Sequence, residues 1–186
     1  MPIGTAPGGS TVMLEFLANT LSPYYLYIKF VHVTAALGWV WSASTAYAYY
    51  LLPVMKAWRR NPHDPEIIPV RNWAMERFED AVVYEHVFFP IILVTGPLMY
   101  ITAGFRPGMA WMDLKLLILI GLFIPVEIAD YYMSHFGGNK YKARAAGDME
   151  RYERLVHRHW WFMLITTPAV MVYGLLIVLL AIAKPI

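Results

Sequence analysis

A lysine and a histidine lie inside an apolar, aromatic stretch near the start of the chain. The stretch YYLYIKFVHVTAALGWVW (residues 24–41) contains Lys29 and His32. An ionisable side chain costs about 2.5–3.5 kcal/mol at the centre of a membrane helix, so each one is a candidate functional group. Lys29 is near enough to the start of the stretch for its amine to reach the membrane surface. His32 lies deeper, and we predict that it is an axial ligand of a buried haem.

The helix face that carries His32 is suited to a flat macrocycle. Ala35 and Ala36 follow His32 at i+3 and i+4, and Gly38 is close by. Residues at these spacings share one face of a helix, so small side chains leave room beside the imidazole. We predict that Trp39, seven positions after His32, packs on the edge of the haem.

A lysine near the start of a later apolar stretch is the candidate partner of His32. At 1.5 Å per helical residue, His32 lies about 10 Å and Lys115 about 6 Å below the same membrane surface. The two groups can therefore face each other. Lys115 acts as a second haem ligand if burial frees its amine from the proton. Otherwise we expect it to pair with Asp113 or with a carboxylate of the cofactor.

A second layer of polar residues lies near the opposite membrane surface, and it consists of Glu85, His86, Glu127, Asp130, His135, His157 and His159. His86 is a candidate ligand of a second haem or of a metal ion. His86, Glu127 and Asp130 are suitable ligands for a non-haem metal, and they could equally form a proton path or a salt-bridged cap. The simpler interpretation is that four of these residues are solvated at the membrane interface: Asp130, His135, His157 and His159.

The two leading histidines enter the membrane from opposite surfaces. His32 and His86 each lie about 10 Å deep in a core about 30 Å thick, which leaves roughly 10 Å between them along the membrane normal. Axial ligands of one iron must be nearly level with it. We therefore predict that the two histidines serve different sites.

Four apolar stretches position these residues. Hydrophobic residues make up 59% of the 186 residues and charged residues 15%, against about 25% charged in a typical soluble domain. Each stretch provides the roughly 20 helical residues that cross a bilayer. We predict an all-α integral membrane protein with a tail (1–22) and one four-helix domain (23–186). The spans are expected near 23–55, 80–104, 109–134 and 160–183, and the second helix is expected to begin before its membrane segment.

The basic residues predict the orientation of the spans. The loops after the first and third spans together carry 11 of them: Lys56, Arg59, Arg60, Arg71, Arg77, Lys140, Lys142, Arg144, Arg151, Arg154 and Arg158. The opposite side has two, Arg106 and Lys184. Because cytoplasmic loops are enriched in lysine and arginine, we predict that both termini lie outside the cytoplasm.

The composition also excludes several kinds of chemistry. The chain has no cysteine, which rules out disulfides, iron–sulfur clusters, covalently attached c-type haem and thiolate nucleophiles. No glycine-rich phosphate loop follows a strand pattern, and no basic patch lies outside the loops that set the topology. We therefore expect no nucleotide or nucleic-acid partner.

The order of these features resembles the HemJ family, four-helix membrane haem proteins that act as protoporphyrinogen IX oxidases. More loosely, the chain is similar to the copper-resistance D-type membrane proteins. The segments that carry the resemblance are YIKFVHV and GWVW in the first span, VVYEHVFFPIILVTGPLMY in the second, WMDLKLLILI in the third, and TTPAVMVYGLLIVLLAIAKP at the end. The resemblance implies that His32 is the haem b ligand and that Lys115 holds the matching lysine position. The family's Asn-Glu pair before the last proline is absent here, where the sequence reads MLITTP (163–168).

Three functions remain open. The first is a membrane haem b protein, with one haem or two, that performs electron transfer or oxidation coupled to quinone or a respiratory partner. The second is a non-catalytic structural subunit of a larger membrane complex. The third is a membrane protein with a histidine–carboxylate metal site. All three place a multi-pass protein in a lipid bilayer, expected to be a bacterial inner membrane, as an oligomer or a complex subunit.

Overall fold

The computed structural model describes residues 9–104 and 108–184, and every regular element within them is a helix. The all-α prediction is therefore confirmed for this part of the chain. Arg106, which entered the orientation argument, and the first eight residues of the tail lie outside the described residues. In chain order the elements are α1 (Gly9–Leu21), η1 (Ser22–Tyr24), α2 (Tyr25–Thr45), η2 (Ala46–Leu51), α3 (Leu52–Arg60), α4 (Ile67–Thr102), α5 (Ala110–Ile118), η3 (Leu119–Phe123), α6 (Ile124–His135), α7 (Lys140–Ala145) and α8 (Met149–Ala183).

Four long helical rods form the bundle, and they are α2–η2–α3, α4, α5–η3–α6 and α8. Two of these rods are interrupted by a π-helical turn. In the first rod η2 separates α2 from α3, and in the third η3 separates α5 from α6. In each rod a proline, Pro53 or Pro125, lies at the start of the helix that follows the turn. Proline lacks the amide hydrogen and its ring crowds the carbonyl of residue i−4, so the preceding turn widens rather than the helix ending.

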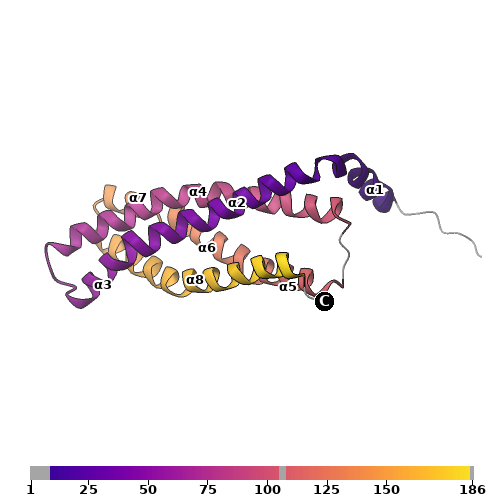
Figure 1. Cartoon of the computed structure of the whole chain (residues 1–186). Helices are drawn as coiled ribbons and strands as arrows, with labels where there is room; N and C mark the ends of the chain where they lie inside the picture. Colours follow the sequence, from indigo (N-terminus) through magenta and orange to yellow (C-terminus); the bar gives the residue numbers. More distant parts are fainter. Residues whose placement is uncertain (1–8, 105–107, 185–186) are drawn as a thin grey trace, which may run out of the picture.

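The described part of the expected tail, residues 9–22, is helical. Helix α1 covers Gly9–Leu21, and the 3₁₀ turn η1, with Pro23 inside it, connects this helix to α2. The side chains of Val12, Met13 and Phe16 are exposed on α1. This helix was not predicted from the sequence. It projects from the end of the bundle, as Figure 1 shows.

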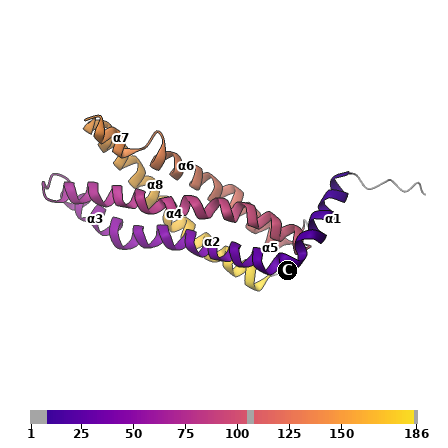
Figure 2. The same cartoon turned by 90° about the horizontal axis from the view of Figure 1, so that it is seen from above.

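The rods run side by side. Helix α2 packs along α4, whereas α5 contacts α8. The connection from α3 to α4 and the short helix α7 lie at one end of the bundle, and α1 and the C-terminus lie at the other (Figures 1 and 2). Helix α4 begins at Ile67, well before residue 80, as expected for the second span. By length and composition, α4 and α8 are both able to cross a membrane.

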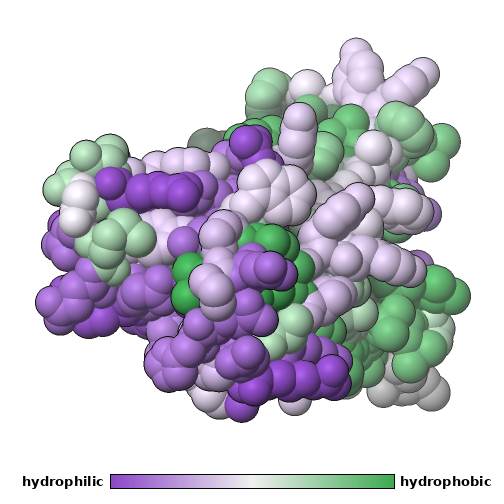
Figure 3. All heavy atoms as spheres, turned by 90° about the vertical axis from the view of Figure 1, so that its left-hand side faces the viewer, coloured by the Kyte–Doolittle hydropathy of each residue, from purple (hydrophilic) through white to green (hydrophobic). Residues whose placement is uncertain are grey.

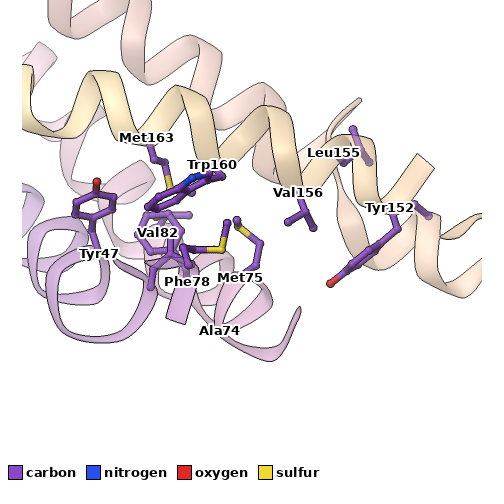
Figure 4. Close-up of a cluster of buried hydrophobic side chains, with 13 residues drawn as sticks. Tyr47, Ala74, Met75, Phe78, Val82, Tyr152, Leu155, Val156, Trp160 and Met163 are labelled. Atoms are coloured by element: carbon purple, nitrogen blue, oxygen red, sulfur yellow. The ribbon is translucent and has the colours of Figure 1, made fainter. Parts of the chain in front are cut away.

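The larger of the two clusters of buried apolar side chains in the described residues lies toward the end that carries α3 and α7. Trp160 of α8 lies beside Phe78 and Val82 of α4 in Figure 4, and its ring stacks on Tyr47 with the centroids 6.3 Å apart. Figure 3 looks at this end of the molecule, over which hydrophilic side chains gather. A compact apolar core thus holds the first rod, α4, α7 and α8 together here, under a polar surface.

Candidate functional site

The His32 imidazole is oriented by a hydroxyl on the neighbouring helix. Its Nδ1 lies 2.8 Å from Thr95 Oγ1, and that hydroxyl donates its own hydrogen to the Ile91 carbonyl at 2.6 Å. Since a threonine hydroxyl has one hydrogen to donate, Thr95 must accept from His32, and Nδ1 carries the proton. Nε2 of the neutral ring is then left with its lone pair, which is the form that binds a metal.

The surroundings of His32 agree only in part with the predicted haem pocket. A Cβ atom on Gly96 would lie 3.5 Å from His32 Cε1, so the ring rests against the backbone of α4. Gly38, however, does not leave room for a macrocycle. A Cβ atom there would lie 2.6 Å from the ring of Phe88. The space beside this glycine is filled by the contact between α2 and α4.

Lys115 lies near His32, on α5. The two side chains are close enough for their charges to interact. The Lys115 amine lies 5.7 Å from the centroid of the Trp111 ring. The predicted ion pair with Asp113 is not formed between these two described residues. The Asp113 carboxylate accepts a hydrogen bond from the backbone N–H of Gly108 at 3.2 Å.

Trp39 has a different contact from the predicted one. Its side chain is 5% exposed, and its ring packs between Phe89 and Phe123 with centroid distances of 5.4 and 5.2 Å. The indole Nε1 donates to Glu127 Oε2 at 3.2 Å. Trp39 therefore connects α2 to a buried carboxylate on α6, and in this structure its edge is turned toward that carboxylate rather than kept free for a cofactor.

His86 belongs to a buried relay of polar side chains. Its Nδ1 lies 2.8 Å from His135 Nε2, and its Nε2 lies 3.3 Å from Asp130 Oδ2. The second contact is close enough for ion pairing but is not aligned as a hydrogen bond. Both ring nitrogens of His86 thus face protein groups.

The relay continues from Asp130 through α8 to α7. Asp130 Oδ1 lies 2.9 Å from His159 Nε2, and His159 Nδ1 lies 2.7 Å from Lys140 Nζ. Lys140 also forms an ion pair with Glu79. Because the ammonium of Lys140 can only donate, His159 accepts at Nδ1 and donates to Asp130 from Nε2. The whole set is Glu79, Lys140, His159, Asp130, His86 and His135, and we name it the buried relay.

For two members of this relay, Asp130 and His159, the interpretation as solvated interface residues is wrong. Asp130 is 8% exposed and His159 is 1% exposed, so both are buried by the packing of α6 and α8 against α4. His135 is half-buried. His157 is exposed as expected and accepts from Trp161 Nε1 at 2.9 Å. His157 and His159 lie on different sides of α8, because residues two apart are about half a helical turn from each other.

Glu79 and Lys140 were not predicted from the sequence as site residues. Glu79 precedes His86 by seven residues, which places both on one face of α4, and this spacing was a signal that could have found it. Lys140 gave no such signal. It follows the turn Gly137–Asn139 and is the first residue of α7, where Asn139 caps the helix by accepting from Lys142 N at 3.0 Å.

A small cavity lies between the buried relay and Trp39. Its volume is about 40 Å³, and its polar lining includes Glu85, Glu127, Asp130 and Thr166. A cavity needs at least roughly 10–15 Å³ to hold a water, so this one has room for a water. Oε1 of Glu127 is buried and has no hydrogen-bond partner among the described residues. The cavity is thus polar, but it is far too small for a haem.

A second set of ion pairs fastens α7 and α8 to α4. Arg144 Nη1 donates to both carboxylate oxygens of Glu76 at 2.7 and 2.8 Å, and the Tyr152 hydroxyl donates to Glu76 Oε1 at 3.0 Å. Burial, together with this carboxylate, raises the pKa of Tyr152. Partial burial and the Asp80 carboxylate likewise raise the pKa of Tyr141 to about 12. Both phenols therefore remain hydrogen-bond donors at any physiological pH.

The candidate metal ligands do not form a metal site. Across residues 9–104 and 108–184, no three His, Asp or Glu side chains are arranged to bind one ion. His32 lies apart from His86, Glu127 and Asp130, which face the buried relay and the cavity. The metal-site alternative therefore has no support from this geometry.

Comparison of the chain with family models, with curated proteins and with solved structures gave no match. The resemblance to the HemJ family therefore stays a prediction from short sequence segments. Two features of the structure bear on the function: the oriented imidazole of His32 and the buried relay.

Proposed function

We propose that the protein is a membrane-embedded haem b protein that performs electron transfer or oxidation coupled to quinone or a respiratory partner. The observation that carries the proposal is the orientation of His32. Thr95 holds its Nδ1–H and leaves the Nε2 lone pair free. Ligand histidines almost always donate their other ring N–H to a neighbouring acceptor, which fixes the tautomer and raises the basicity of the ligand.

The residues of the chain then have defined tasks. His32 holds the iron through Nε2, and Lys115 supplies either a second ligand or a cation for a carboxylate of the haem. These residues lie on α2 and α5, and α2 packs chiefly on α4 whereas α5 packs on α8. The bound haem would accept and donate single electrons. A quinol or a porphyrinogen is the proposed class of substrate.

The proposal includes four membrane spans with both termini outside the cytoplasm. The spans are the rods α2–η2–α3, α4, α5–η3–α6 and α8. Two observations support this arrangement: α4 and α8 are long and apolar enough to cross a membrane, and the basic residues of α3, α7 and the start of α8 gather at one end of the bundle. Positive residues on one side are typical of the cytoplasmic face.

The test is an absorption spectrum of the detergent-purified protein, oxidised and then reduced with dithionite. We expect reduced haem b bands in the wild type, their loss in His32→Ala, and their retention in His86→Ala, because both nitrogens of His86 face protein groups. His63→Ala, which removes an exposed histidine, is the matched control. A colourless but folded wild type would contradict the proposal and favour the structural-subunit alternative.

A further inference from the structure

We propose that His135, His86 and Asp130 conduct protons between the aqueous phase at the α3/α7 end of the bundle and Glu127 in its interior. The proposed haem function supplies the use for these protons, since the oxidation of a quinol or porphyrinogen releases protons as well as electrons. The path itself is built from side chains of this chain and can be tested without the haem.

The first part of the path is the pair His135 and His86, in which the direction of the hydrogen bond between the two rings is defined. His86 Nε2 faces the Asp130 carboxylate, so the hydrogen of the neutral ring is favoured on Nε2 by the negative charge. Nδ1 of His86 then accepts from His135 Nε2 at 2.8 Å. His135 is half-buried at the end of α6, whereas the side chain of His86 is 5% exposed. His135 is therefore the member that water reaches.

The second part is the cavity next to Asp130. Glu127 and Asp130 are three residues apart on α6 and share one helix face, about 5–6 Å apart at Cβ. Both line the cavity of about 40 Å³. Oδ2 of Asp130 and Oε1 of Glu127 are buried and have no aligned hydrogen-bond partner in the described part of the chain. A water in the cavity can bridge the two oxygens and carry a proton from one to the other.

The charges around Glu127 favour the protonated form of its carboxyl group. From α4, Glu85 lines the same cavity and His86 faces Asp130; from α6, Asp130 is one turn away; from α2, Trp39 donates a hydrogen bond. Helix α8 contributes the hydroxyls of Thr166 and Thr167 to the cavity and no charge. Carboxylates that share a site of low dielectric constant cannot all be ionised, so at least one of them holds a proton.

The protons balance along the path. A proton from water binds His135 Nδ1, and His135 passes its Nε2 proton to His86 Nδ1. The His86 ring then turns to align its Nε2–H with Asp130 Oδ2, 3.3 Å away, and gives that proton to the carboxylate. Asp130 releases a proton to a cavity water, and that water gives one to Glu127 Oε1. One proton enters and one arrives, and rotation of the two rings or the return of protons in the opposite direction resets the chain.

The rest of the buried relay positions Asp130 and does not conduct. Lys140 has no exposed surface and Glu79 is 4% exposed, so water does not reach them. Lys140 directs His159 Nε2 at Asp130 Oδ1. Oδ2 of the same carboxylate is thereby turned toward His86 and the cavity.

The test is infrared spectroscopy of the purified, lipid-reconstituted protein after a pH jump, with the carboxylic C=O stretch as the signal. We expect a band that is lost on alkalinisation in the wild type and absent in Glu127→Gln. Glu150→Gln, which changes an exposed carboxylate of α8, leaves it unchanged. In His135→Ala we expect the band to respond at least tenfold more slowly, with rescue by added imidazole, while His63→Ala responds like the wild type.

Two outcomes would overturn the path: a band that persists in Glu127→Gln, or a response in folded His135→Ala that is as fast as in the wild type. Rescue by imidazole separates proton transfer from a structural role, because a misfolded variant does not recover its rate. The spectra do not need haem. A colourless protein with the expected infrared behaviour would reject the haem function and keep the path.

Discussion

At the scale of single residues, the neighbours of each histidine decide what its ring can do. Thr95 leaves one nitrogen of His32 free, whereas His135 and Asp130 face both nitrogens of His86. The two histidines looked alike as candidate ligands in the sequence. A hydroxyl on the next helix separates them, and Thr95 is therefore the residue to change first.

We expect Thr95→Val to weaken haem binding by about 10–100-fold, the usual effect of losing the hydrogen-bond partner of a ligand histidine. The affinity is measured by titrating haem into the haem-free protein and following the absorbance. Thr102→Val is the matched control, because Thr102 also lies on α4 and donates to a backbone carbonyl, that of Leu98, at 2.7 Å. Equal affinities for Thr95→Val and the wild type would show that the hydroxyl does not orient the ligand.

Lys140 is a second residue whose surroundings set its role. Its ammonium has no exposed surface and pairs with the buried Glu79. We expect Lys140→Met to lower the free energy of unfolding by about 3–5 kcal/mol, because it leaves a buried carboxylate without its counter-charge. Denaturant unfolding followed by circular dichroism measures the change. Lys142→Met removes an exposed lysine from the same helix and is expected to change little, and adding Glu79→Gln to Lys140→Met is expected to restore part of the loss.

At the scale of elements, the most extensive contact between two helices of the described chain is between α2 and α4. Gly38 allows it, since a Cβ atom there would lie 2.6 Å from the Phe88 ring. We expect Gly38→Ala to lower the free energy of unfolding by about 1–3 kcal/mol through overpacking. Gly174→Ala on α8 is the control, because no heavy atom lies within 4 Å of its added Cβ.

The same denaturant measurement checks this contact as a pair. If the clash is the cause, Phe88→Leu should reduce the effect of Gly38→Ala, and the two changes together should cost less than their sum. If the changes in the free energy of unfolding simply add, the destabilisation by Gly38→Ala has another cause, for example in the backbone of α2.

At the scale of the whole molecule, the distribution of basic residues predicts which end faces the cytoplasm. The chain has no cysteine, so single cysteines report their location without background. We expect a membrane-impermeant maleimide to label Asn19→Cys, on α1, in intact spheroplasts. Asn61→Cys, after α3, should be labelled only after lysis. The reverse pattern would invert the proposed topology and move the entrance of the proton path to the other side of the membrane.

The sequence by itself determined the helical class, the four apolar stretches and the early start of α4. Apolar length and composition are local properties, and a helix satisfies its backbone hydrogen bonds within one segment. For the same reason the sequence identified His32 and the inner polar layer as candidates, since their depth follows from their position along a helix. It did not reveal α1 as a helix, because exposed residues with little apolar periodicity give a weak signal.

Only the tertiary structure decided which of these groups meet. Lys140 and Glu79 are 61 residues apart, and His159 and Asp130 are 29 apart, so no spacing along one helix connects them. Their contact depends on how each helix is rotated about its axis, and side-chain packing such as Trp160 on Tyr47 fixes that rotation. Depth can be read from a sequence because it counts residues along one axis. The partner of a buried charge cannot, because it is set by the packing of several helices at once.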